Sequence, residues 1–393
     1  MIIESLMERR KLRRKVQGIA AALLPYESDG RIAVEAFQRH LVVTQRAGLM
    51  NAVNMDTGYV NYLSEAEKQE VLRWTREALG AGVPFVAGAY IEGQSGDVVA
   101  LYRREMERIA EFGGIPILFQ TARLHGKSGE EKAEVLRWTR EALGAGVGFV
   151  AGAYIENQSV HGAGEVVALY RREMERIVAL GGIPILFQTA RLHGKSAEEK
   201  AATYRAVCRG FPRVLAFELG PMFAPNGEIF DEETVRRLMD IPELAGMKHS
   251  SLDRMAELGR LALRDAQRPE FQIYTGNDLG INMIEYGSDY LLGLATFATE
   301  KFAERDRLWE AGDPGYYALS DALQYLGNVA FREPVPAYKH SAAVFLHLTG
   351  RIPTDLPHPR NPKRPIWERE ILRDCARRLG IVALGDHGKR GAS

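Results

Sequence analysis

The chain has 393 residues, of which 46% are hydrophobic and 26% are charged, the balance of an ordinary globular protein with a large core. Lys+Arg and Asp+Glu both number 51, so the net charge gives no support to binding of nucleic acid or of an anionic membrane. No run approaches the roughly 18 apolar residues of a membrane span, and no signal-peptide pattern begins the chain, so we expect a cytoplasmic protein.

Short apolar runs alternate with helical patterns over about the first 300 residues. The runs predicted to be buried strands, taken in chain order and with one copy of an internal repeat, are 19–24, 50–55, 85–90, 115–120, 214–219, 244–248, 272–275 and 290–294. Helical patterns separate them, as at 34–46, 67–79 and 232–239. Near-continuous apolar strands that alternate with helices are typical of a parallel sheet covered on both faces.

The internal repeat lies between the second and fifth of these strands. Segment 113–128 (GGIPILFQTARLHGKS) recurs without change at 181–196, and the two units span 67–130 and 131–198. Each unit has the pattern helix–strand–helix–strand. Solenoid proteins need about three or more copies, and their copies diverge, so this pattern indicates a duplication instead. The sequence alone does not separate a recent tandem duplication, an engineered one and an error of sequence assembly.

With one copy counted, the predicted strands number eight, which is the number in a closed (β/α)8 TIM barrel. We therefore predict an α/β fold with a TIM-barrel domain at 1–300 and a C-terminal helical region at 301–393. A barrel fixes strand number, tilt and shear together, so two extra strands are not absorbed freely. We expect one copy to complete an eight-stranded ring and the other to be extruded; a ten-stranded ring is the alternative.

Lys248 ends an apolar strand, and the active site of such a barrel lies at the strand ends and the loops that follow them. Partial desolvation there lowers the pKa of an amine, and a neutral amine can attack a ketone to form an imine. The other interpretation is a lysine that extends from a strand end to solvent. Position alone does not decide between the two.

Segment 246–251 (GMKHSS) closely resembles the Schiff-base lysine motif of the dihydrodipicolinate synthase / N-acetylneuraminate lyase family. Further segments resemble the family's first strand, its second-strand loop, its seventh-strand end and its C-terminal helical segment, namely 18–26 (GIAAALLPY), 57–68, 275–278 (TGND) and 334–339 (PVPAYK). The resemblance implies a barrel with a C-terminal helical bundle, assembled as a homo-oligomer (tetramer or dimer). It also implies a lyase, an aldolase or dehydratase, that acts on a 2-oxo acid or sugar acid through an imine at Lys248.

Two departures from the family pattern leave the particular reaction open. Family members usually carry a proton-relay tyrosine on the fifth strand, where this chain has Phe217 followed by Glu218. The carboxylate-binding loop that usually has the sequence TTGE is DTGY at 56–59, and an ionised Asp56 would repel a carboxylate. Dihydrodipicolinate synthase activity itself is therefore not expected.

Several side chains are candidates for the site. The predicted substrate-binding residues are Asp56, Thr57, Gly58, Phe217 and Asn277. Lys248, Tyr59 and Glu218 are the predicted catalytic residues, and Tyr274 is a further candidate by location. Strand alternation would point Glu218 away from its neighbour Phe217, so a solvated or salt-bridged carboxylate is the favoured alternative there. For Tyr59 the alternative is ordinary aromatic packing.

Other kinds of site lack a motif. Cys208 and Cys375 lie far apart, and the histidines show neither HxH nor HExxH spacing, so we expect no disulfide framework and no metal. No nucleotide-binding glycine motif is present, so we expect no cofactor and only a small-molecule 2-oxo acid as partner, with no nucleic acid and no membrane. A catalytically silent barrel that binds a small carboxylate as a sensor or scaffold is the alternative, favoured by Phe217 and by the duplication.

Overall fold

The computed structural model describes residues 7–91, 98–118, 136–137, 140, 149–155, 163–221, 227–251 and 253–384. These residues contain ten strands, all parallel, in a single sheet. The strands are β1 (Gly18–Ala21), β2 (Met50–Val53), β3 (Val86–Ala89), β4 (Ile115–Leu118), β5 (Phe149–Ala153), β6 (Gly182–Leu186), β7 (Val214–Leu219), β8 (Leu244–Ser250), β9 (Gln272–Thr275) and β10 (Tyr290–Leu292).

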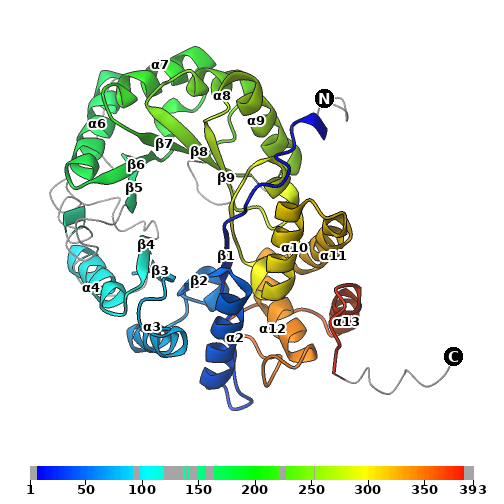
Figure 1. Ribbon diagram of the computed structural model, residues 1–393. Coiled ribbons are helices and arrows are strands. Elements are labelled where there is room, and N and C mark those ends of the chain that lie inside the picture. The colour runs from blue at the N-terminus through cyan, green and yellow to red at the C-terminus, as the bar shows by residue number, and fades with distance from the viewer. Residues whose placement is uncertain are drawn as a thin grey trace.

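Helices follow the strands and surround them (Figure 1). They are α2 (Val34–Ala47), α3 (Glu65–Leu79), α4 (Val98–Glu111), α6 (Ala163–Ala179), α7 (Ala197–Cys208), α8 (Glu232–Met239), α9 (Arg254–Gln267), α10 (Thr299–Ala311), α11 (Gly315–Ala330), α12 (Tyr338–Leu348) and α13 (Glu368–Arg378). Helix α3 begins two residues before the predicted start, because Ser64 and Glu67 form a capping box that satisfies the first free amides.

The strand order is β4-β3-β2-β1-β10-β9-β8-β7-β6-β5, and Figure 1 shows this order running around a ring inside the helices. The prediction of a TIM-type barrel is confirmed, with ten strands where eight were expected. The hypothesis that one repeat copy is extruded is wrong. The first copy joins the sheet through the pairing of β3 with β2, and the second copy joins through the pairing of β6 with β7. Both copies thus lie in the sheet, and the two strands at its ends, β4 and β5, belong to different copies.

The two copies fold alike where both are described. Val86 pairs with Ile115 in the first copy, and the equivalent Val150 pairs with Ile183 in the second. Near-identical sequence therefore gives the same parallel register twice.

Side chains alternate along the strands between a buried face against the helices and a face toward the ring's interior. The helix-facing residues belong to two apolar clusters, one that joins β1–β3 to the C-terminal helices and one that joins β5–β9 to α6–α9. On β6, for example, Leu186 is buried in the second cluster, whereas Ile183 and Ile185 on the interior face are half-buried. The interior of an eight-stranded barrel is a packed core. Because diameter grows with strand number, ten strands leave interior side chains partly open to solvent.

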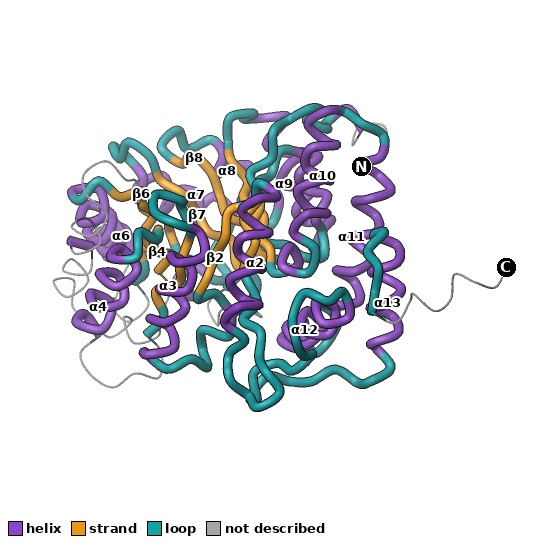
Figure 2. The backbone as a smooth tube through the Cα atoms, turned by 60° about the horizontal axis from the view of Figure 1, so that its bottom comes forward, coloured by secondary structure: helices purple, strands orange, loops and turns teal. Residues whose placement is uncertain are grey.

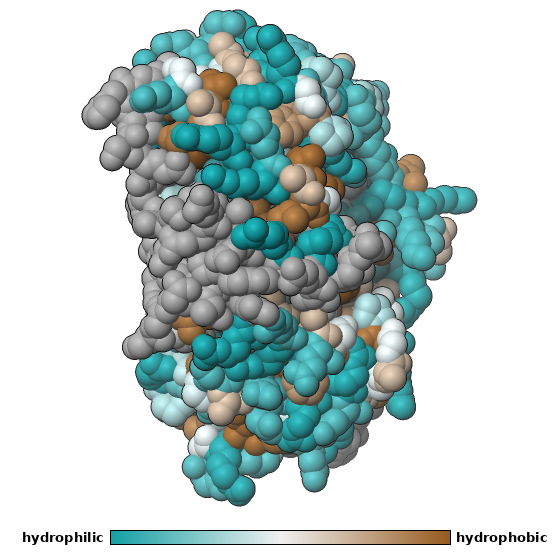
Figure 3. Space-filling model, turned by 90° about the vertical axis from the view of Figure 1, so that its left-hand side faces the viewer, coloured by the Kyte–Doolittle hydropathy of each residue, from teal (hydrophilic) through white to brown (hydrophobic). Residues whose placement is uncertain are grey.

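The helices after β10 lie against one side of the ring, as Figure 2 shows. Residues of α10–α13 share the first apolar cluster with β1–β3, so these helices pack on the barrel through a common core. The domain limit predicted near residue 300 stays a prediction. None of the helices in the described residues is long and apolar enough to cross a membrane. On the side that carries α4 and α6 the described surface is mainly hydrophilic with interspersed apolar patches (Figure 3).

Candidate active site

Lys248 lies near the carboxyl end of β8, with its side chain toward the interior of the ring. The strand register pairs it with Phe217 of β7 on one side and with Tyr274 of β9 on the other. Paired residues of neighbouring parallel strands project from the same face of a sheet, so these three side chains lie in one row. The Nζ atom of Lys248 lies 5.0 Å from the ring centroid of Phe217, a cation–π distance.

The surroundings of Lys248 favour a neutral amine. Its side chain is exposed to the interior, and none of the described acidic side chains forms an ion pair with it. Protein atoms nevertheless surround the amine closely enough to desolvate it. This enclosure lowers the pKa of Lys248 from its ordinary 10.5 by disfavouring the charged form.

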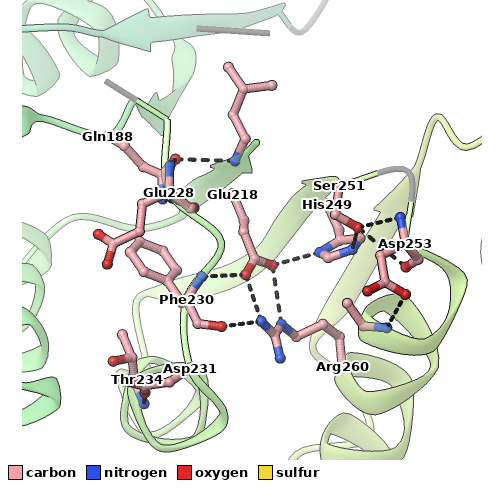
Figure 4. A network of polar contacts seen from close by, with 12 residues as sticks. Gln188, Glu218, Glu228, Phe230, Asp231, Thr234, His249, Ser251, Asp253 and Arg260 are labelled. Atoms are coloured by element: carbon pink, nitrogen blue, oxygen red, sulfur yellow. Dashed lines mark hydrogen bonds and ion pairs between the residues drawn. The ribbon is translucent and has the colours of Figure 1, made fainter. Parts of the chain in front are cut away.

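Glu218 follows Phe217 on β7 and therefore lies on the opposite face of the strand from the row that contains Lys248. Figure 4 shows its carboxylate pointing toward His249 and Arg260. It is fully buried and accepts hydrogen bonds from Arg260 at 2.7 Å and from the backbone N–H of Phe230 at 2.9 Å. Burial raises the pKa of this carboxyl, but the contacts with His249 and Arg260 outweigh it, so the pKa lies below its ordinary value. The geometry argues against a direct role for Glu218 at Lys248, because the sheet itself separates the two side chains.

His249, next to the lysine in sequence, connects Glu218 to the segment after β8 (Figure 4). Its Nδ1 lies 2.6 Å from Glu218 Oε2, and its Nε2 lies 2.6 Å from Ser251 Oγ. An ionised carboxylate only accepts hydrogen bonds, so Nδ1 donates to it. The chain of contacts has the order of a Ser–His–acid triad, but Ser251 is buried and also accepts from the backbone N–H of Asp253. These contacts fix the end of β8, and with it the position of Lys248.

The loop after β2 holds three predicted substrate-binding residues in the short 3-10 turn η1 (Asp56–Gly58). Asp56 accepts from Lys339 Nζ at 2.9 Å and from the Tyr338 hydroxyl at 3.0 Å, which neutralises the charge that would repel a carboxylate. The Thr57 hydroxyl is buried and lies 2.8 Å from that of Tyr338. A Cβ at Gly58 would lie 3.1 Å from the carbonyl oxygen of Ala22, so the turn needs a glycine to pack this closely.

Tyr59, predicted to be catalytic, follows this turn and is fully buried. Its ring contacts those of Tyr26 and His358 with centroids 5.9 and 5.8 Å apart, and its hydroxyl has no hydrogen-bond partner among the described residues. Burial raises the pKa of Tyr59 well above its ordinary value. The aromatic-packing alternative thus describes its surroundings, and none of its contacts reaches Lys248.

Asn277, the remaining predicted substrate-binding residue, lies two residues after β9 and is 3% exposed. It lies close to Glu257 of α9, on the helix side of the sheet, and not on the face that carries Lys248. Burial raises the pKa of Glu257 to about 7, and the nearby side chains of Thr275 and Asn277 offset part of this effect.

The structure therefore divides the predicted residues into two groups. Lys248 and Phe217 lie together on the interior face, joined there by Tyr274. The residues of η1 lie at the same rim of the parallel sheet but next to β1 and β2, whereas Glu218 and Asn277 lie behind the sheet. Among the described residues no group of three or more His, Cys, Asp or Glu side chains could hold a metal ion.

Comparisons with known proteins give the same fold. No family model matches the chain, and no curated protein matches its sequence. Solved structures do match: a monomeric dihydrodipicolinate synthase variant (14% identity, TM-score 0.53) covers 94% of this chain and 98% of its own. Dihydrodipicolinate synthase from Aquifex aeolicus (13%, 0.52) covers 94% and 99%, and the Acinetobacter baumannii enzyme complexed with pyruvate (16%, 0.51) covers 94% and 100%. This chain has the dihydrodipicolinate synthase fold.

In TIM-barrel enzymes the active site lies at the carboxyl ends of the strands, which is where Lys248 lies in this chain. Sequence analysis did not point to His249, Arg260 and Tyr338, which contact Glu218 or Asp56. His249 lies within the lysine motif, so its position was a signal. Arg260 and Tyr338 come from helices, and only the folded chain shows that they contact Glu218 and Asp56.

Proposed function

We propose that the protein is a Schiff-base-forming lyase, an aldolase or dehydratase, that acts on a 2-oxo acid or sugar acid through an imine at Lys248. The observation that carries the proposal is the environment of this lysine. It is exposed to the interior, it has no ion-pair partner among the described residues, and its pKa is lowered by burial. A neutral amine at the carboxyl end of a barrel strand is suited to attack on a carbonyl carbon.

In the proposed reaction, Nζ of Lys248 adds to the carbonyl carbon of the 2-oxo acid and the carbonyl oxygen leaves as water. The resulting iminium accepts the electron pair of a bond at the neighbouring carbon, so that a carbonyl fragment (aldolase) or a proton (dehydratase) departs and an enamine forms. The enamine carbon then takes up a proton in the aldolase reaction, or the enamine expels a hydroxyl group from the next carbon as water in the dehydratase reaction, and either step restores an imine. Water hydrolyses this imine, which releases the product and the free amine. The crystallised Acinetobacter enzyme binds pyruvate, which supports a 2-oxo acid as the class of substrate.

The substrate carboxylate needs a partner, and the η1 turn supplies one in this proposal. The Thr57 hydroxyl binds the carboxylate, while Lys339 balances the charge of Asp56. Tyr274 is the proposed proton carrier, because it shares the face of Lys248 on the adjacent strand and Phe217 cannot transfer a proton. Its hydroxyl donates to Gln272 Oε1 and would have to leave this partner to reach the substrate.

Reductive trapping tests the proposal. Full-length protein is incubated with each member of a panel of 2-oxo acids and sodium borohydride, and its intact mass is measured. We expect one reduced adduct per chain with at least one compound, and none in a Lys248→Met variant. If no 2-oxo acid adds mass to the parent chain, the lyase proposal fails and the silent binding barrel replaces it. The homo-oligomeric state is also a proposal, and sedimentation of the same sample measures it.

A further inference from the structure

An aromatic row extends from Lys248 across the interior face of the neighbouring strands. The Phe217 ring, 5.0 Å from the lysine Nζ, makes an edge-to-face contact with the ring of Phe187 at a centroid distance of 5.1 Å. Phe187, directly after β6, contacts Tyr154, directly after β5, at 6.3 Å. All three rings are half-buried, so part of each ring surface is exposed to solvent and not packed in the hydrophobic core.

The backbone beside this row leaves room for the rings. A Cβ built on Gly152 of β5 would lie 2.5 Å from the ring of Phe187, closer than any side chain tolerates. The absence of a side chain at Gly152 therefore lets Phe187 lie across the neighbouring strand.

Lys248 is the one charged side chain on the described interior face of β5 to β9. On the described parts of β5 to β9 the interior-facing residues are Val150, Gly152, Ile183, Ile185, Leu215, Phe217, Leu219, Gly246, Lys248, Ser250, Gln272 and Tyr274. Lys248 alone among them carries a charge. A sugar acid or a phosphorylated substrate would need polar or cationic partners along its length. Apart from Ser250, Gln272 and the Tyr274 hydroxyl, these strands offer apolar and aromatic surface.

We propose that the carbonyl compound that reacts at Lys248 carries an apolar, preferably aromatic, group that packs against Phe217 and Phe187. This inference rests on the proposed function and narrows its substrate class. The 2-oxo group lies at the amine, and the aromatic group extends along the row toward Tyr154. The ten-stranded ring supplies the width that such a group needs, because an eight-stranded interior is filled by its own side chains.

A comparison of phenylpyruvate with pyruvate tests the inference. Each compound is titrated against full-length protein under borohydride, and labelling is normalised to that of N-acetyl-lysine amide, which corrects for the different reactivity of the two ketones. We expect phenylpyruvate to reach half-maximal labelling at a concentration about tenfold or more below that of pyruvate, from burial of its ring.

Two variants test whether the preference for phenylpyruvate comes from the aromatic row. Phe217→Ala should reduce the preference for phenylpyruvate to about twofold or less, while pyruvate still labels Lys248. Phe211→Ala is the matched control, because Phe211 packs under Arg171 on the helix side of the sheet and should leave the preference unchanged. Equal normalised labelling by both ketones, or an unchanged preference in Phe217→Ala, would overturn the inference and leave the proposed function intact. Labelling by neither ketone nor any other 2-oxo acid would remove the proposed function itself.

Discussion

Two lysines at the rim of the barrel have opposite environments. Lys339 of α12 is 2% exposed, pairs with Asp56 at 2.9 Å, and lies within 6 Å of the ring centroids of Tyr59, Tyr62 and Tyr338. Lys248 of β8 is exposed to the interior, has one aromatic neighbour at a cation–π distance, and has no acidic partner among the described residues.

This difference in surroundings indicates which of the two lysines can act as a nucleophile. The ammonium of Lys339 pairs with the carboxylate of Asp56 and lies near three aromatic rings, so it is buried and already has partners. A nucleophile must instead be neutral and accessible, and only the surroundings of Lys248 favour both conditions. We therefore assign reactivity to Lys248 and a stabilising role to Lys339.

Exchange of each lysine for methionine gives the largest expected effect. Lys248→Met should abolish imine trapping and lower turnover at least about a thousandfold, because no other group can form the imine. It should not lower the free energy of unfolding, since it removes a desolvated amine. Lys339→Met should lower that free energy by on the order of 1 kcal/mol, because Asp56 is largely exposed and its pairing is screened. Trapping and urea denaturation measure the two quantities, and the assignment is wrong if the effects are reversed.

Removal of one repeat copy should change the surroundings of Lys248 and leave those of Lys339 alone. Deletion of residues 131–198 joins Glu130 to Glu199 and leaves 325 residues, enough for an eight-stranded ring. We expect a folded protein whose narrower interior traps phenylpyruvate at least about tenfold less well, with a smaller loss for pyruvate. Far-ultraviolet circular dichroism checks the fold. If a folded deletion variant traps phenylpyruvate as well as the parent protein does, the width of the ring does not control the access of this ketone to Lys248.

Tyr274→Phe tests the third member of the interior row. Removal of its hydroxyl should lower turnover by about ten- to a hundredfold, as expected for loss of a proton carrier, without reducing imine trapping at Lys248. Tyr62→Phe, in the aromatic group around Lys339, is the matched control and should leave both quantities unchanged. Equal turnover of parent and Tyr274→Phe proteins would mean that another group moves the proton.

The pH dependence of trapping gives the smallest effect. A lowered pKa means that a larger fraction of Lys248 is neutral at a given pH than for an exposed amine. The initial trapping rate should therefore rise with pH and reach half its maximum below pH 10.5, the ordinary value. Quenched-flow mass spectrometry measures the trapping rate of the protein and of free N-acetyl-lysine amide across the same pH range. If the two rates depend on pH in the same way, burial does not lower the pKa of Lys248.

The sequence predicted the strands well because their apolar runs are short and bounded by turns. β7 and β9 have the predicted limits, Val214–Leu219 and Gln272–Thr275. The extrusion of one repeat copy was predicted wrongly, because the argument from core filling assumed that the interior must be packed. The half-buried side chains of Ile183 and Ile185 show that it is not.

The site was predictable only where it depends on local sequence. The lysine motif identified Lys248. Alternation of side chains along β7 predicted that Glu218 would face away from Phe217, and therefore from Lys248. The partners of Asp56 were not predictable, because Tyr338 and Lys339 lie more than 280 residues further along the chain. The place of Asn277 near α9 could not be predicted, because its position after β9 does not show which way it turns; its role in substrate binding stays a prediction.

The most direct test of the account locates the reduced imine on the chain. Protein treated with phenylpyruvate or pyruvate and borohydride is digested, and the modified peptide is sequenced by mass spectrometry. The account predicts an adduct on Lys248 and none on Lys339, in the parent chain and in the Lys339→Met variant alike. An adduct on Lys339, or on any lysine other than Lys248, would contradict it.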